Sequence, residues 1–208
     1  MTKRERAAAQ RRQLILEAAM TCFLEHGYHQ SGVRDIAKQA GISLGNLYNH
    51  FPGKHDVLVE IAALERAGLE PVLKLLQRED EPPTLLEAFI QSYGQLIAEP
   101  DSLLLTIEIT SEAVRKPDIG ALFLGNRDEL VRALQGLIDR GIERGDFRRT
   151  SDSLETAHFI VELIDACAYR SVLSEVDMTK QLSHLREFVF ASLQRSKEGK
   201  SMEKKGDL

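Results

Sequence analysis

The chain has 208 residues, 43% of them hydrophobic and 6% aromatic, and a net charge of −5 at neutral pH. These values exclude a fibrous or wholly disordered chain, and the length allows one or two domains with an adequate core. Cys22 and Cys167 each lie on the apolar stripe of an expected helix, which favours buried thiols over a disulfide. The charged first residues are followed by no long apolar run. We therefore expect a cytoplasmic protein with no membrane partner.

Charge is unevenly divided along the chain. Residues 1–54 contain eight Lys/Arg and four Asp/Glu, a net of +4, so the remaining residues carry −9. A basic first part attached to an acidic remainder indicates that the first part faces phosphate groups. A charged segment that is merely solvated is the alternative interpretation.

The first expected helix spans residues 10–26 and ends at Gly27, with its apolar residues recurring at the helical period. Residues 1–9 before it are expected to form a flexible basic arm. The helix should bury the following side chains: Leu14, Ile15, Ala18, Ala19, Cys22 and Phe23.

Residues 33–52 show the pattern of two short helices joined by a tight glycine turn. One face of the first helix is apolar, and Gly41 supplies the left-handed backbone conformation that ends it. Ser43 can cap the second helix, which packs through Leu47 and Phe51. The exposed front of the second helix begins with small and polar residues, so it can enter the major groove of DNA.

Helical periodicity continues to the end of the chain, with prolines at several joints. Pro71 should kink or split the first of the later helices, and Thr84 with Glu87 forms a plausible capping box. The later helices are expected at residues 54–77, 84–98, 101–115, 118–144, 151–173 and 178–195. The polar tail, residues 196–208, is expected to be disordered. The predicted fold class is all-α, with about nine helices.

Four short segments in the first part of the chain follow one another at a fixed spacing. They are Ile15-Leu16-Glu17-Ala18-Ala19 with Phe23; Gly27-Tyr28; Val33-Arg34-Asp35-Ile36-Ala37; and Gly45-Asn46-Leu47-Tyr48-Asn49-His50-Phe51 with Lys54. In order and spacing, and without a gap, they resemble the DNA-binding domain of the TetR family of bacterial transcriptional regulators. The resemblance covers about a quarter of the chain. It implies a helix-turn-helix domain at residues 10–54, followed by a helical ligand-binding and dimerisation domain at residues 55–195.

The resemblance also implies which residues contact double-stranded DNA. The expected backbone contacts are Ser31, Gly32, Arg34, Tyr48, His50 and Lys54, and the expected base-reading positions are Ser43, Leu44, Gly45 and Asn49. At the position of Leu44 the family more often has lysine or another polar residue. The resemblance therefore does not decide whether this position contacts a phosphate or a base. Tyr48 has an alternative role in packing between helices, and His50 an alternative role as a structural histidine.

In the resembled family the last two long helices of each chain pair with their counterparts to form a dimer. Residues 151–173 and 178–195 fit this role, although an intramolecular core helix is the alternative. The interface candidates are Phe159, Ile160, Leu163, Ile164, Cys167, Leu185, Phe188 and Val189. Such a dimer places two recognition helices about 34–36 Å apart, or somewhat further, and therefore predicts a palindromic operator.

The second domain of the resembled family encloses a small molecule that alters the separation of the DNA-reading helices. Polar residues set among apolar ones are the pocket candidates: Phe89, Tyr93, Glu108, Glu112, His158, Glu162, Asp165 and Tyr169. Glu112 has an alternative as a partner of Arg115 or Lys116 on a solvated helix face. His158, Glu162 and Asp165 share a helix face that could hold a metal, but a solvated face or an internal hydrogen bond is the favoured alternative. No metal or cofactor is predicted.

The function predicted from these features is a homodimeric repressor that binds a palindromic operator and is released by a small molecule. A ligand-independent or activating regulator is the alternative within this class. A helical enzyme is a second alternative, but the chain has no nucleophile elbow, no HExxH motif and no phosphate-binding glycine loop. A protein-interaction module would leave the exposed helix face and the charge asymmetry unexplained.

Overall fold

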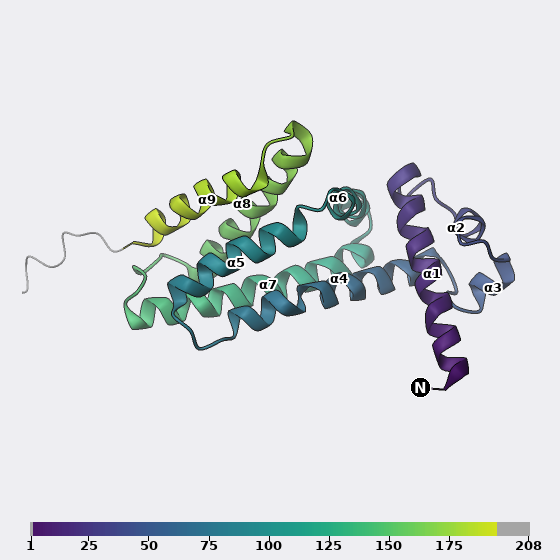
Figure 1. Cartoon of the computed structure of the whole chain (residues 1–208), viewed down its shortest axis with the longest axis horizontal. Helices are drawn as coiled ribbons and strands as arrows, with labels where there is room; N and C mark the ends of the chain where they lie inside the picture. Colours follow the sequence, from purple (N-terminus) through teal and green to yellow (C-terminus); the bar gives the residue numbers. More distant parts are fainter. Residues whose placement is uncertain (1, 195–208) are drawn as a thin grey trace, which may run out of the picture. The chain divides into compact units, whose positions relative to one another are not determined.

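The computed structural model describes residues 2–194, and every regular element in this part of the chain is an α-helix (Figure 1). The nine helices are α1 (Lys3–His26), α2 (Val33–Gln39), α3 (Leu44–Tyr48), α4 (Lys54–Leu76), α5 (Pro82–Ile97), α6 (Pro100–Arg115), α7 (Pro117–Arg144), α8 (Ser153–Ser174) and α9 (Met178–Leu193). The predicted all-α class and the predicted number of helices are confirmed. The predicted tail, residues 196–208, lies outside the described residues.

Prolines begin three of the helices. Pro82, Pro100 and Pro117 are the first residues of α5, α6 and α7, where the missing amide hydrogen costs no helical bond. The capping box predicted at Thr84 is wrong, because α5 begins two residues earlier and Glu87 forms an ion pair with Arg186 of α9.

Helix α1 begins at Lys3, seven residues before its predicted start. Thr2 and Glu5 form a capping box, in which the Glu5 amide donates to Thr2 Oγ1 and the Thr2 amide donates to Glu5 Oε2. The three alanines at residues 7–9 have the highest helix propensity of any residue. Most of the segment predicted as a flexible arm is therefore helical. Leu14, predicted to be buried, is exposed.

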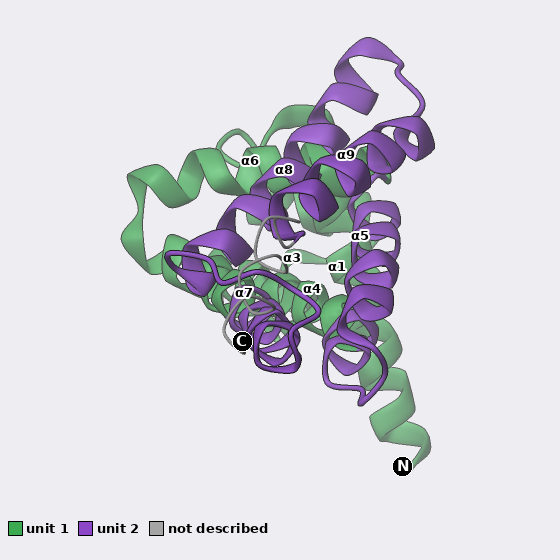
Figure 2. Cartoon of the chain, turned by 90° about the vertical axis from the view of Figure 1, so that its left-hand side faces the viewer, with its two compact units in different colours: residues 1–70, 99–128 green, residues 71–98, 129–208 purple. Residues whose placement is uncertain are grey.

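Helix α4 is continuous through Pro71, so the split is wrong, and the alternative of a kink stays a prediction. Residue 71 nevertheless begins the second of two compact units, which Figure 2 shows in different colours. Residues 1–70 and 99–128 form unit 1, and residues 71–98 and 129–208 form unit 2.

Unit 1 is built around the first three helices. Their core side chains, including Phe23, Ile36 and Phe51, belong to one apolar cluster with Ile109 of α6 and Ile119 of α7. The unit therefore contains one segment, residues 99–128, that lies far beyond the predicted DNA-binding domain in sequence. The functional boundary after residue 54 stays a prediction.

Unit 2 contains the packed helices α5, α8 and α9. Helix α5 packs against both others, and α8 packs against α9. Gly94 permits the close approach of α5 and α9, because a Cβ atom there would lie 2.6 Å from Leu182 Cδ1. The apolar faces are buried, with Phe89, Ile164 and Val189 at most 1% exposed.

Both cysteines are free thiols, Cys22 buried and Cys167 half-buried. Burial is the largest cause that raises the pKa of each thiol. Among the residues that the structure describes, no helix is long and apolar enough to cross a membrane.

Candidate DNA-binding site

The helix-turn-helix is formed by α2, the turn after it and α3. The Asp35 carboxylate accepts a hydrogen bond of 2.8 Å from the Gly32 amide and so stabilises the start of α2. Gly41 has a φ of 65°, the left-handed conformation that the turn requires. Ser43 Oγ accepts from the Asn46 amide at 3.2 Å and caps α3, as predicted. The predicted glycine turn and serine cap are both confirmed.

Helix α3 separates its polar side chains from its apolar ones. Leu47 and Phe51 are buried, as predicted, whereas Tyr48 is 48% exposed and Asn49 is exposed. Ser43 and Gly45 are also exposed. The surface of α3 therefore offers hydrogen-bonding groups to solvent, and base edges in the major groove are read by such groups.

The remaining candidates on this surface differ in accessibility. Arg34 is exposed on α2, and His50 is half-buried just after α3. Leu44 is also half-buried and packs against the unit 1 core, so its apolar side chain is partly used for folding. Hydrophobic packing gives this position a role that the sequence pattern did not reveal.

Arg12 positions the C-terminal end of α3, and no sequence motif marks it for this role. Its guanidinium donates to the His50 carbonyl at 2.8 Å and to Glu60 at 2.7 Å, and it lies 4.3 Å above the Phe51 ring. One side chain of α1 thus connects the end of the recognition helix with α4. Bidentate donation and stacking on an aromatic ring suit arginine better than lysine.

Lys54 supports the turn between α1 and α2. Its ammonium group donates to the carbonyls of Tyr28 at 2.7 Å and Ser31 at 2.9 Å, and lies 4.1 Å from the Tyr28 ring centre. Burial lowers the pKa of Lys54, and Lys116 adds to the effect while Glu112 opposes it. The predicted phosphate contact stays a prediction, but this cation already has partners inside the protein.

Ser31 and Gly32, two further phosphate candidates, also have internal partners. The Ser31 hydroxyl is buried within 2.8 Å of the Cys22 carbonyl and 2.9 Å of the Gly27 carbonyl. The Ser31 amide donates to Gly27, and the Gly32 amide donates to Asp35. A DNA contact from either residue would have to replace one of these bonds, and both contacts stay predictions.

Two glutamates of α6, predicted as pocket residues, lie instead beside this turn in unit 1. Glu108 Oε2 accepts from the Tyr28 amide at 3.2 Å. Glu112 is only 3% exposed, and its carboxylate lies 3.4 Å from His29 Nδ1, 3.6 Å from Arg115 and 3.3 Å from Lys116. Its pairing with Arg115 and Lys116 is confirmed, but the solvated helix face is wrong because the carboxylate is buried.

Comparison with known proteins agrees with this geometry. Residues 15–61 match the family model described as bacterial regulatory proteins, tetR family. Residues 15–61 therefore form a DNA-binding domain of the TetR family of transcriptional regulators. This regulator is 26% identical to the fatty acid metabolism regulator protein of Bacillus subtilis over 166 residues, 77% of this chain and 83% of that protein. It is 25% identical to the transcriptional repressor AcnR of Corynebacterium efficiens over 187 residues, 88% and 93% of the two chains.

The fold of the TetR-family chain is likewise similar to solved structures. The transcriptional regulator FadR from Bacillus subtilis, solved in complex with stearoyl-CoA, matches with a TM-score of 0.75 at 22% identity. The match covers 88% of this chain and 99% of FadR.

In unit 2 of this regulator, α5 and α8 contribute all of the other pocket candidates. The Tyr93 hydroxyl donates to Asp165 Oδ1 at 3.0 Å, and the Tyr93 ring stacks on Phe89 at 5.6 Å. The internal hydrogen bond considered for Asp165 is thus confirmed. By helical spacing, His158, Glu162 and Tyr169 lie on the same flank of α8 as Asp165. Within residues 2–194 no cluster of potential metal ligands is present.

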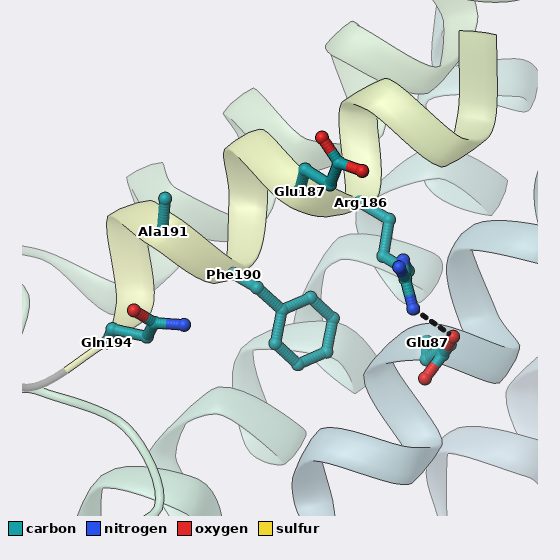
Figure 3. Close-up of a pocket in the computed structure, with 6 residues that line it drawn as sticks. All are labelled: Glu87, Arg186, Glu187, Phe190, Ala191 and Gln194. Atoms are coloured by element: carbon teal, nitrogen blue, oxygen red, sulfur yellow. Dashed lines mark hydrogen bonds and ion pairs between the residues drawn. The ribbon is translucent and has the colours of Figure 1, made fainter. Parts of the chain in front are cut away.

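A surface hollow of unit 2 lies between α5 and α9 (Figure 3). Phe190 and Arg186 of α9 point towards α5, where Arg186 forms an ion pair of 2.7 Å with Glu87. None of the predicted pocket residues lines this hollow.

The dimer candidates of the TetR-family regulator divide into two groups. Ile160, Ile164, Leu185 and Val189 are buried within the chain, which agrees with the alternative of an intramolecular core. In contrast, Phe159, Leu163 and Phe188 are 61%, 37% and 64% exposed. Half-buried Cys167 lines a shallow groove together with Leu163 and Phe188. Phe159 and Leu163 lie on the flank of α8 that faces away from Asp165, and Phe188 lies on α9.

Proposed function

We propose that this TetR-family regulator is a homodimeric repressor that acts in the cytoplasm on a palindromic operator and is released by a small molecule. The exposed polar surface of α3, on a helix-turn-helix held by buried contacts, is the observation that carries the proposal. The family match to residues 15–61 supports the same assignment.

Recognition of the operator is assigned to the exposed part of α3. Asn49 can pair with adenine, whereas Tyr48 and Arg34 are suited to backbone phosphates. Lys54 has a different place in this proposal, because its bonds to Tyr28 and Ser31 keep the turn before α2 in position. We therefore expect Lys54→Ala to weaken binding to all DNA sequences and also to destabilise unit 1.

Dimerisation is assigned to the exposed flank of α8 and α9. Phe159, Leu163 and Phe188 form an apolar surface that a second copy of the chain would remove from water. A two-fold symmetric dimer uses the same surface on both copies, and it presents two recognition helices to two half-sites.

Effector binding is assigned to unit 2, on the flank of α8 that carries Asp165. The Tyr93–Asp165 hydrogen bond and the neighbouring His158, Glu162 and Tyr169 offer polar groups next to buried apolar side chains. An effector releases DNA only if it binds the two conformations of the regulator unequally. The bound stearoyl-CoA of the Bacillus subtilis FadR structure makes this acyl-CoA a reasonable first probe.

Selection of binding sites from random duplex DNA tests the core of the proposal. The expected result is enrichment of a palindrome, with saturable binding that scrambled duplex of equal length does not compete away. On that palindrome, Asn49→Ala should change the preference among single-base variants, whereas Tyr48→Ala should reduce binding to all of them. If no palindrome is enriched, the regulator is not a sequence-specific dimer of this kind.

Effector release and the direction of regulation need separate measurements. Stearoyl-CoA is titrated into the protein–operator complex, with coenzyme A alone as the matched control, and Asp165→Asn tests the assigned flank. Release by stearoyl-CoA but not by coenzyme A supports an acyl-CoA effector, and no release contradicts it. A promoter fusion that is more active without the regulator indicates repression, and one that is less active indicates activation.

A further inference from the structure

The positive charge of the DNA-binding part lies in ten residues at its beginning. Residues 3–12 contain five basic residues and one acidic residue, whereas residues 13–54 contain three of each. The helix-turn-helix itself is therefore close to neutral. The charge that attracts DNA phosphate comes instead from the first turns of α1.

These residues form an ordered helix that the core of unit 1 does not require. Residues 2–11 are all exposed, and the first buried residue of α1 is Ile15. At 1.5 Å per residue, the nine residues before Arg12, back to Lys3, continue the helix for about 14 Å. The capping box pairs the Thr2 amide with the Glu5 carboxylate and the Glu5 amide with the Thr2 hydroxyl. The basic side chains, and not these amides, are therefore the groups offered to a partner. Within residues 2–194, the side chains of Lys3, Arg4, Arg6 and Arg11 form no ion pair.

Arg12 fixes the position of this extension relative to the recognition helix. Its guanidinium is bonded to the His50 carbonyl, immediately after α3, and to Glu60 of α4. The helix α1 therefore passes the end of α3 at Arg12, and its earlier residues continue beyond that point. Figure 1 shows this end of α1 projecting with no other helix of unit 1 beside it.

The spacing of the basic residues directs two of them to the side of the domain. Arg4 and Arg11 are eleven and four residues before Ile15, and such spacings place all three on one helix face. Ile15 faces the core, so Arg4 and Arg11 face the same side beyond the edge of the core. Lys3 is one residue before Arg4, about 100° around the helix axis, whereas Arg6 lies on the opposite side of the helix.

We propose that residues 3–11 of α1 form a second DNA-contact element, in which Lys3, Arg4 and Arg11 bind backbone phosphates next to the half-site contacted by α3. The proposal rests on the proposed function of α3 as the recognition helix. Duplex DNA is the occupant because α3 brings it to the end of the domain from which this helix projects. Binding through phosphates adds affinity without sequence preference and depends strongly on salt.

The test compares two triple variants with the same loss of charge. In the first, Lys3, Arg4 and Arg11 are replaced by Gln, a good helix former that preserves α1. In the control, Arg132, Arg149 and Lys180 of unit 2, all exposed, are replaced by Gln. Binding to the selected palindrome and to scrambled duplex is measured over a range of salt concentrations, and circular dichroism checks that both variants remain helical.

The first variant should weaken binding to both duplexes by the same factor, with the ratio of the two affinities unchanged. The slope of log affinity against log salt should become shallower by roughly 2 to 5 for a dimer, since each phosphate contact contributes about 0.9. The control variant should retain the wild-type slope. Hydroxyl-radical footprints should lose protected backbone positions beside each half-site only in the first variant.

Equal slopes and footprints for wild type and the first variant would overturn the proposal. A fall in the affinity ratio would also overturn it, because that result assigns the extension to positioning of α3 instead of phosphate binding. Failure of wild-type protein to prefer the palindrome would be a separate result, and it would contradict the proposed function.

Discussion

The surfaces of α3 in unit 1 and of α8 and α9 in unit 2 are opposite in chemistry. On α3 the apolar Leu47 is buried and the polar Asn49 is exposed, whereas on α8 and α9 the aromatic Phe159 and Phe188 are exposed. A polar exposed surface suits a hydrated, charged partner such as DNA, and an apolar one suits another protein surface. Helices of the same periodicity thus expose a polar surface in unit 1 and an apolar surface in unit 2, and each surface suits a different kind of partner.

The largest expected effect comes from removing a buried ring in the helix-turn-helix. Phe51→Ala should lower the free energy of unfolding by about 3–5 kcal/mol, because it opens a cavity under the Arg12 guanidinium. Tyr48→Ala, three residues earlier, should cost less than about 1 kcal/mol while it weakens operator binding. Chemical denaturation and DNA titration measure the two effects. Equal destabilisation by both variants would assign Tyr48 to packing.

A charge placed on the exposed aromatic surface of unit 2 should have the next largest effect. Phe188→Glu should raise the dimer dissociation constant by at least about thirtyfold, or about 2 kcal/mol, because a carboxylate would be buried in an apolar interface. Ser183→Glu, on the other exposed flank of α9, is the matched control and should leave the dimer intact. Analytical ultracentrifugation gives the result, and an unaltered dimer in Phe188→Glu would place the interface elsewhere.

The two units also differ in how deeply they bury their ion pairs. Glu112→Gln should destabilise the protein by about 1–3 kcal/mol, because it removes a buried carboxylate from beside His29, Arg115 and Lys116. Glu87→Gln breaks the exposed pair with Arg186 and should cost less than about 1 kcal/mol. Thermal and chemical denaturation compare the variants, and a reversed order would contradict the buried position of Glu112.

The smallest expected effect is a difference in thiol reactivity. Burial raises the pKa of both thiols, so at neutral pH each carries less thiolate than an unfolded cysteine and reacts more slowly. Half-buried Cys167 should react before buried Cys22. Because Cys167 lines the groove beside Phe188, dimer formation should protect it, and Phe188→Glu should accelerate its reaction several-fold. An aromatic disulfide reagent measures these rates, and identical rates in both proteins would separate Cys167 from the interface.

Local sequence features determined most of the helices and the recognition motif. Gly41, Ser43 and the prolines at the helix starts act on their own neighbours, so their effects can be predicted without the fold. The exception at the start of α1 is also local. There, the Thr2–Glu5 capping box and three alanines outweigh the charged character from which a flexible arm was predicted.

Only the tertiary structure decided the partners of the polar side chains. Lys54 bonds to carbonyls 26 and 23 residues earlier, Glu108 to an amide 80 residues earlier, and Arg12 to a carbonyl 38 residues later. No local periodicity encodes such pairs, because they depend on which helices pack together. The same reason explains the divided dimer candidates: the sequence identified α8 and α9 as broadly apolar, and packing decided that Ile160 faces inward and Phe159 outward.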